Sequence, residues 1–326
     1  MKKSKVNKIS FEVILLAIVE LIINILSLKV PSLFFELMFI APIPIVILTV
    51  KYKETIASIV SIMVFLLLLL FFTIPQALVN LFLFGIVGIA IGYCLRNRLS
   101  LKLSIIVGGV SYIVAFILIH LIFISFYKIN IIQDLFISKT LIFLENNKSS
   151  IGEIFKLNGA SKDAAYLQIR EYFDMVFLLI PCFITAISLV GGYIVLIISL
   201  AIIKQMKIGT FDIEPFSQFK LPLGFGIAYI IAQFALWGKD LKYGYNDKWT
   251  MIFSNMFWLL TFSFMVQGIA LIDFWLKKIG LTGILRVMAY AAGSVVIIPF
   301  ILFFPTILVI IGILDYVIDF RKLEAK

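Results

Sequence analysis

The chain has 326 residues, of which 63% are hydrophobic and only 14% are charged. Soluble domains have about 45–50% apolar and about 25% charged residues. The composition therefore excludes an ordinary cytosolic enzyme, a secreted disulfide scaffold and a nucleic-acid-binding domain. Many apolar runs reach the roughly 20 residues that a helix needs to cross a bilayer. We predict an all-α integral membrane protein whose main partner is the lipid bilayer.

The net charge of +10 is explained by basic residues that flank the apolar runs, where they orient a membrane protein. Cys94 and Cys182 lie within apolar runs and form no CxxC or metal-ligand spacing. We therefore expect no disulfide, no metal site and no cofactor. The basic start of the chain leads into Phe11–Leu28 without a small-residue cleavage site, so this run is predicted to be a retained first helix.

Charged residues, prolines and glycines divide the chain into ten apolar runs. Within lipid, single segments of this length satisfy their backbone hydrogen bonds only as helices. The last two runs form one long apolar stretch broken by Pro299 and Pro305, and we expect a hairpin there rather than one helix of roughly 58 Å. The predicted spans are Phe11–Leu28, Leu33–Val50, Thr55–Ile74, Pro75–Leu95, Leu103–Tyr127, Phe173–Ile203, Leu221–Gly238, Thr250–Leu276, Thr282–Ile298 and Ile301–Phe320.

The distribution of lysine and arginine predicts the orientation of these spans. With both termini in the cytoplasm, 18 of the 28 basic residues lie on the cytoplasmic side. Six of the other ten lie in one long outer loop, Lys128–Tyr172, which also contains five acidic residues. We divide the chain into a six-helix domain, residues 1–204, and a four-helix extension, residues 205–326.

The outer loop is the one substantial segment outside the predicted spans. Apolar residues crowd one side of the stretch 131–145, which predicts a short helix on the membrane surface. A second helix is expected through residues 162–173 into the sixth span. The loop is either a functional lid, as long loops often are, or a cover for helix ends.

Several polar residues fall within the outer halves of the spans, where an ionisable group costs about 2.5–3.5 kcal/mol. Glu20 and Asn24 share one face of the first span, and the only histidine, His120, lies at a similar depth of about 12–13 Å. Glu36 and Asn80 also lie in the outer half. We predict that these five residues line an outward-facing polar pocket. The alternative is that Glu20 is protonated or hydrogen-bonded purely for helix packing, and that His120 is satisfied by a backbone carbonyl.

A second polar group is predicted at the cytoplasmic end of the last spans. Asp315 and Asp319 lie one helical turn apart and are followed by Arg321, while Arg286 lies one turn inside the ninth span. We expect ion pairs that hold the C-terminal helices together, with Arg286 pairing with Asp315 because an unpaired arginine would be costly.

Three segments resemble the YybS family of bacterial multi-spanning membrane proteins, which is known as a domain of unknown function. They are PFSQFKLP at Pro215, QGIALIDFWL at Gln267 and GILDYVIDFRK at Gly312. The first six spans also resemble the substrate-binding S components of energy-coupling-factor transporters. This resemblance implies a six-helix fold with an outer-half pocket for a vitamin or a metal ion. The YybS resemblance implies a multi-pass protein of the bacterial plasma membrane.

The first span departs from S components at their alanine-x-x-x-alanine docking motif, because Leu21 follows Ala17 at that spacing. Our leading hypothesis is a solute-binding or transport-type protein, for a small solute or cation. The alternative is a non-transporting scaffold that recruits cell-envelope or division proteins as membrane partners. One histidine and the lack of HExxH and GxSxG motifs argue against an enzyme.

The topology can be tested directly. A protease or a thiol reagent added outside intact cells should reach the Lys128–Tyr172 loop and should not reach either terminus, because the basic residues hold the termini inside. Labelling of a cysteine placed at Lys326 from the outside would contradict this orientation.

Overall fold

The computed structural model describes residues 2–148, 150, 162–209, 215–240, 248–281, 283, 285–286, 288 and 304–322. Every regular element among these residues is a helix, which confirms the predicted all-α class. The chain forms two compact units. Unit 1 comprises residues 1–177 and 187–212, and unit 2 comprises residues 178–186 and 213–326.

Six helical segments are long and apolar enough to cross a membrane, which confirms a membrane protein. They are Phe11–Lys29, Pro31–Tyr52, Ile74–Arg96, Leu101–Tyr127, Ile180–Gln205 and Lys248–Lys278. Shorter apolar helices at Glu54–Leu68, Gly224–Trp237 and Pro305–Ile318 coincide with three other predicted spans. The ninth predicted span, Thr282–Ile298, lies almost entirely outside the described residues. The ten-span topology therefore remains a prediction.

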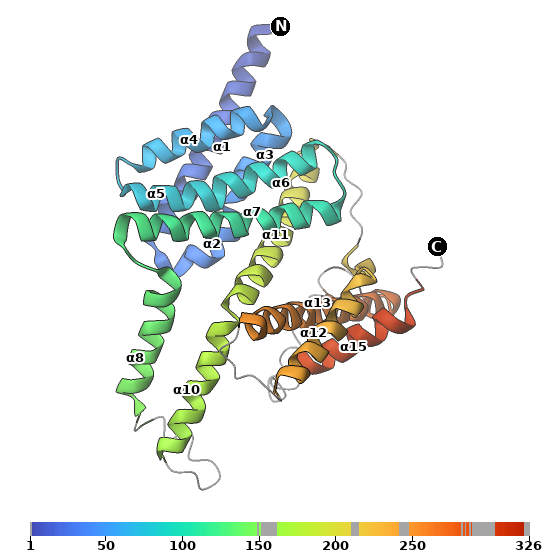
Figure 1. Ribbon diagram of the computed structural model, residues 1–326. Helices are drawn as coiled ribbons and strands as arrows, with labels where there is room; N and C mark the ends of the chain where they lie inside the picture. The colour runs from blue at the N-terminus through green and yellow to red at the C-terminus, as the bar shows by residue number, and fades with distance from the viewer. Residues whose placement is uncertain are drawn as a thin grey trace. The chain divides into compact units, whose positions relative to one another are not determined.

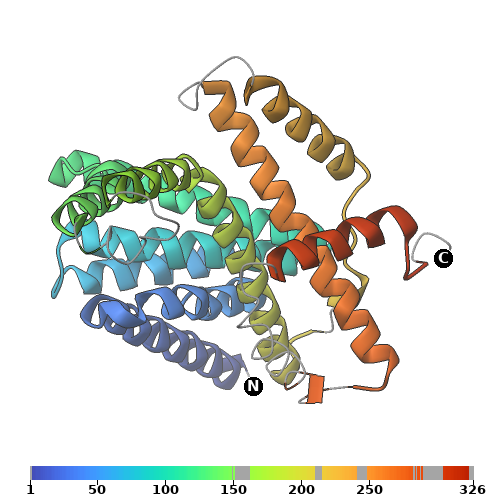
Figure 2. The ribbon, with the colours of Figure 1, turned by 90° about the horizontal axis from the view of Figure 1, so that it is seen from below.

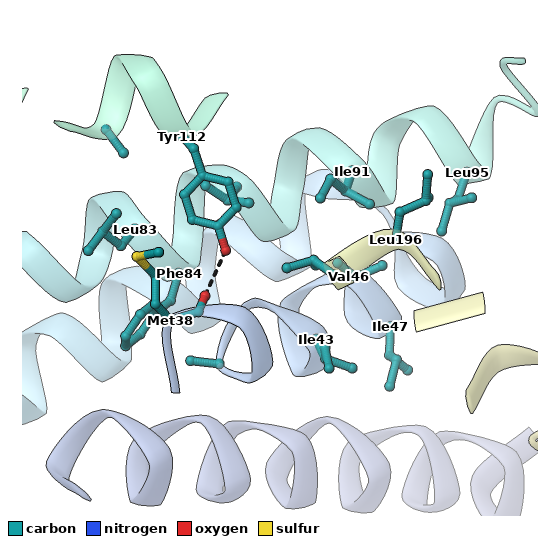
Figure 3. Packing of buried hydrophobic residues seen from close by; sticks show 14 of the residues in the cluster. Met38, Ile43, Val46, Ile47, Leu83, Phe84, Ile91, Leu95, Tyr112 and Leu196 are labelled. Carbon is teal, nitrogen blue, oxygen red and sulfur yellow. Dashed lines mark hydrogen bonds between the residues drawn. The ribbon is translucent and has the colours of Figure 1, made fainter. Parts of the chain in front are cut away.

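Unit 1 contains most of the described helices (Figure 1). Its apolar core joins α2, α3, α6, α7 and α11, and includes the fully buried Phe84, Ile91 and Leu196 (Figure 3). The elements are α1 (Lys2–Lys29), η1 (Pro31–Leu33), α2 (Phe34–Ile40), α3 (Pro42–Tyr52), α4 (Glu54–Leu68), α5 (Ile74–Asn80), η2 (Leu81–Ile86), α6 (Val87–Arg96), α7 (Leu101–Ile122), η3 (Phe123–Tyr127), η4 (Ile131–Ile137), α8 (Ser138–Asn146), α10 (Lys162–Leu178) and α11 (Ile180–Gln205).

Pro42 interrupts the backbone hydrogen bonds of the second span. Because proline has no N–H, the carbonyl of Met38, four residues earlier, loses its usual helical donor. The buried Tyr112 hydroxyl on α7 donates to this carbonyl oxygen at 2.6 Å (Figure 3). A side chain from another helix thus satisfies the group that the proline releases, as a lipid environment requires.

Two glycines of α6 bring this helix close to α3. A Cβ atom on Gly88 would lie 2.7 Å from the Pro42 carbonyl oxygen, and one on Gly92 would lie 2.5 Å from the Thr49 Cβ. No larger residue fits at either position without moving the helices apart. These glycines therefore serve packing within the chain.

The segment predicted to form the outer loop is helical where the sequence predicts helices. η4 and α8 form one continuous helical stretch, Ile131–Asn146, and α10 begins at Lys162. Figure 1 shows α8 and α10 running across the direction of α6 and α7. Residues 151–161 lie outside the described part of the chain.

The predicted sixth span, Phe173–Ile203, is wrong as a single helix, because α10 ends at Leu178 and α11 begins at Ile180. The break lies beside Pro181, and the side chain of Asn255 occupies it. The Asn255 amide donates to the Leu178 carbonyl and its oxygen accepts the Cys182 N–H, both at 2.8 Å. In an unbroken helix these two backbone groups would bond to each other, so Asn255 replaces one helical hydrogen bond with two.

Unit 2 is built on α13 (Lys248–Lys278), which packs against α12 (Gly224–Asp240) and α15 (Phe304–Ile318). Figure 2 shows α15 crossing α13. At this crossing the backbones touch: a Cβ on Gly312 would lie 1.9 Å from the Phe264 carbonyl oxygen, and one on Gly268 would lie 2.2 Å from the Leu308 carbonyl oxygen. Only glycine permits this approach.

The substitution Gly312→Ala should lower the free energy of unfolding by about 1–3 kcal/mol, because α13 and α15 must separate to admit the methyl group. Gly224→Ala is the matched control, since no atom lies within 4 Å of its added Cβ. Thermal unfolding of the purified protein in detergent measures both variants. Equal melting temperatures for the two would contradict the close crossing.

Candidate functional site

The clearest polar site of unit 1 is centred on Glu20, whose side chain is only 2% exposed in the middle of α1. The amide of Asn24, one turn later, donates to the Glu20 carboxyl oxygen Oε1 at 3.0 Å and to the Glu20 backbone carbonyl at 2.8 Å. The helical spacing of four residues places both side chains on one face. The predicted association of Glu20 with Asn24 is therefore present as a direct hydrogen bond.

Asn80, at the end of α5, joins this face of α1. Its amide nitrogen donates to the Asn24 backbone carbonyl and to the Ser27 hydroxyl, both at 3.1 Å. Ser27 in turn donates to the Asn24 carbonyl at 2.8 Å. We refer to Glu20, Asn24, Ser27 and Asn80 as the Glu20 cluster.

The local backbone around Asn80 is unusual. The helix changes at this residue from α-helical α5 to the π-helical turn η2. A π-helical segment within an α-helix widens the turn and is frequent at functional sites. The Asn80 side chain is completely buried, so this transition delivers a polar group to the interior of the unit.

The Glu20 cluster is closed in this conformation. All four side chains are at most 2% exposed, and two of their oxygen atoms, Glu20 Oε2 and Asn80 Oδ1, are buried without a hydrogen-bond partner. Within the described residues, an open outward-facing pocket around Glu20 is not observed.

The other two predicted pocket residues do not join the cluster. Glu36 is exposed near the start of α2. His120 is half-buried on α7, and its Nδ1 atom has no hydrogen-bond partner. Similar depth therefore did not bring His120 to Glu20, because depth along a helix does not determine which helices are neighbours.

The sequence predicts no metal site, and the described residues contain no group of three or more His, Cys, Asp or Glu side chains that could hold an ion. The polar residues of the Glu20 cluster supply one carboxyl, two amides and one hydroxyl. This set can bind a proton, or hydrogen-bond a small solute when the cluster opens.

A second buried polar network lies in unit 2. Arg321 binds the Asp315 carboxylate through two nitrogens, at 2.5 and 3.2 Å, and donates to the Ser217 carbonyl at 2.8 Å. Gln267 donates to Asp315 at 2.9 Å and accepts the Leu221 N–H at 3.1 Å. The network therefore attaches the segment 215–222 to α13, through Gln267, and to the C-terminal end of α15.

The predicted pairing of Arg286 with Asp315 is wrong. Arg286 lies 3.3 Å from Asp273, and Asp273 also lies 3.5 Å from Lys277. Asp319 pairs with Lys220 at 3.2 Å. The Asp315 carboxylate is paired with Arg321, which follows it on the same chain segment.

Sequence reasoning missed two members of this network, Gln267 and Ser217. Gln267 is completely buried and Ser217 is 3% exposed. Both lie in the segments that resemble the YybS family, but a neutral polar side chain carries no clear signal in a single sequence. A buried glutamine that bonds to a carboxylate and to a backbone N–H group is recognisable only once the helices are placed.

Comparison with protein families gives a match over most of the chain. Residues 18–316 match a family described as predicted membrane protein, DUF2232. No curated protein and no solved structure matches the chain.

The pair Asp315–Arg321 can be tested with a double-mutant cycle. Asp315→Leu alone and Arg321→Met alone should each lower the free energy of unfolding by about 3–5 kcal/mol, because each leaves the other charged group buried without its partner. The double variant Asp315→Leu, Arg321→Met should be less destabilised than the sum of the single variants. Unfolding in SDS measures all three, and strict additivity would show that the two residues do not interact.

Proposed function

The chain belongs to the DUF2232 family of predicted membrane proteins, and we propose that it is a solute-binding or transport-type protein whose site is the Glu20 cluster. In this proposal the protein spans the bacterial plasma membrane ten times with both termini in the cytoplasm. The ligand is a small solute or a cation, bound without catalysis.

The observation that carries the proposal is the complete burial of Glu20 together with Asn24 and Asn80 from a second helix. A carboxyl group in the middle of a membrane helix is costly and is a functional site by default. Packing alone is achieved more cheaply by an apolar residue at the same position. The π-helical turn beside Asn80 adds a local irregularity of the kind that accompanies functional sites.

The resemblance of the first six spans to S components supports the same site, because their pocket lies in the outer half of the membrane. The two resemblances drawn from the sequence, to S components and to the YybS family, remain predictions. The missing docking alanine at Leu21 means that we do not assign a transport motor as partner.

The alternative, a non-transporting scaffold, is favoured by one observation: the Glu20 cluster is filled by its own side chains in this conformation. A scaffold would keep the cluster closed permanently. A transport-type protein has to open it to water during part of its cycle, and this difference is measurable.

Cysteine labelling distinguishes the two functions. In a protein whose Cys94 and Cys182 are replaced by alanine, Ser27→Cys should react slowly with a membrane-impermeant thiol reagent added from outside. Ser27 is 1% exposed in the closed conformation, so a reaction there requires opening. The change from serine to cysteine is nearly isosteric and should preserve the fold.

Ser199→Cys is the matched control, because Ser199 is also completely buried in unit 1 but lies outside the Glu20 cluster. It should stay unlabelled under the same conditions. Equal protection of both cysteines over many hours would contradict a transport-type function and would favour the scaffold.

A further inference from the structure

We propose that Glu20 carries a proton in the closed conformation and that this proton is the ion exchanged when the Glu20 cluster opens. The inference rests on the function proposed above and names the coupled ion. It follows from a count of the hydrogen-bond donors and acceptors in the cluster.

The cluster uses every hydrogen that it can donate. The Asn24 amide donates both of its hydrogens to Glu20, to the backbone carbonyl and to Oε1. The Asn80 amide donates both to Asn24 O and Ser27 Oγ, and the Ser27 hydroxyl donates its one hydrogen to Asn24 O. Two acceptors, Glu20 Oε2 and Asn80 Oδ1, are left over.

The orientation of the two amides is determined by the backbone. Side-chain oxygen and nitrogen atoms of asparagine are assigned from their partners, and each amide here has a backbone carbonyl as one partner. A carbonyl only accepts, so the group facing it has to be the NH₂ group. Exchanging oxygen and nitrogen in either side chain would place two acceptors against each other, and the surplus of acceptors is therefore real.

A proton on Glu20 Oε2 supplies the donor that the cluster lacks. It also removes the negative charge, which matters because a buried carboxylate needs a cationic partner. Among the described residues, the Glu20 side chain bonds only to Asn24.

Ionisable groups on the helices packed against α1 do not compensate a charge at Glu20. Lys51 and Tyr52 of α3 both bind Glu12, two turns away from Glu20 on α1. Glu36 of α2 and Glu54 of α4 are acidic, so they would add repulsion rather than relieve it. α5, which contributes Asn80, contains no ionisable residue.

A metal ion fits these atoms less well than a proton. Hard cations such as magnesium and calcium take six or more oxygen ligands, whereas two side-chain oxygens remain without a partner in the cluster. A proton needs one oxygen and no additional space.

The chemical step is an acid–base exchange with water. When the cluster opens, the O–H bond at Glu20 Oε2 breaks, the proton passes to a water molecule and the electron pair stays on the carboxylate. Closing requires the reverse transfer, because the closed site cannot hold the uncompensated charge. Opening is thereby coupled to proton release.

Infrared spectroscopy of the purified protein at neutral pH tests the proton directly. The wild-type protein should show the carbonyl stretching band of a protonated carboxylic acid, and Glu20→Gln should remove it. Glu145→Gln, at an exposed position on α8, is the control and should leave the band unchanged. A spectrum in which Glu20→Gln removes only carboxylate bands would overturn the proposal.

Thermal unfolding at constant pH in sodium, potassium or choline chloride tests whether a metal cation, rather than a proton, binds at Glu20. Equal melting temperatures in the three salts are expected. Stabilisation by sodium or potassium that Glu20→Gln abolishes would assign a metal cation to the site and overturn the proton.

If Glu20→Gln does not accumulate, Asn24→Ala provides a second measurement. This change removes the amide that donates to Oε1, so the carboxylic acid band should move to higher frequency while remaining present. An unshifted band would show that it belongs to another group and would overturn the assignment.

The outcomes separate this inference from the proposed function. If the acid band shows a protonated Glu20 but Ser27→Cys never reacts, the buried proton stands and the transport-type function is contradicted. If Ser27→Cys reacts but the acid band is missing, the proposed function stands and the proton is not its ion.

Discussion

Backbone polar groups that helices release inside the membrane have to be satisfied by other parts of the protein, because lipid offers no hydrogen bonds. The described spans meet this constraint with single side chains from neighbouring helices. The Tyr112 hydroxyl donates to the Met38 carbonyl, which has no helical donor because of Pro42. The Asn255 side chain bonds to both backbone groups that are left unpaired at the break near Pro181. Helix irregularities therefore determine where polar side chains are placed. The Glu20 cluster follows the same rule, since Asn80 reaches the α1 backbone from the end of a regular helix.

The sequence predicted the helical elements well because apolar runs and their flanking charges determine where a helix can lie in a bilayer. The helical stretch 131–146 and the last helix, Phe304–Ile318, appear where the pattern placed helices. The division of Phe173–Ile203 was missed, since Pro181 alone does not reveal whether a proline kinks a helix or ends it. The answer depends on Asn255, which is distant in sequence.

The candidate site was predictable only in part, for a geometrical reason. Glu20 and Asn24 are on one helix, so their contact follows from a spacing of four residues. Asn80 was singled out by its polarity, but its contact with Asn24 depends on which helices are neighbours. His120 was predicted to join the site because it lies at the same depth as Glu20, but it is not a member of the Glu20 cluster. Likewise, Arg286 had several acidic groups within reach at one end of the bundle, and charge alone could not distinguish Asp273 from Asp315.

The short helix α4 has a consequence for the surrounding lipid. Its 15 residues span about 22 Å, less than the roughly 30 Å hydrocarbon core of a typical bilayer. Leu70 and Phe71, in the turn that follows, are 71% and 69% exposed. They extend the apolar surface by less than one helical turn, about 5 Å, which still leaves it shorter than the hydrocarbon core. A bilayer adapts to such hydrophobic mismatch by thinning locally, at a modest cost per ångström. The lipids beside α4 are therefore expected to be the thinnest around unit 1, and the protein should partition toward thinner regions of its membrane.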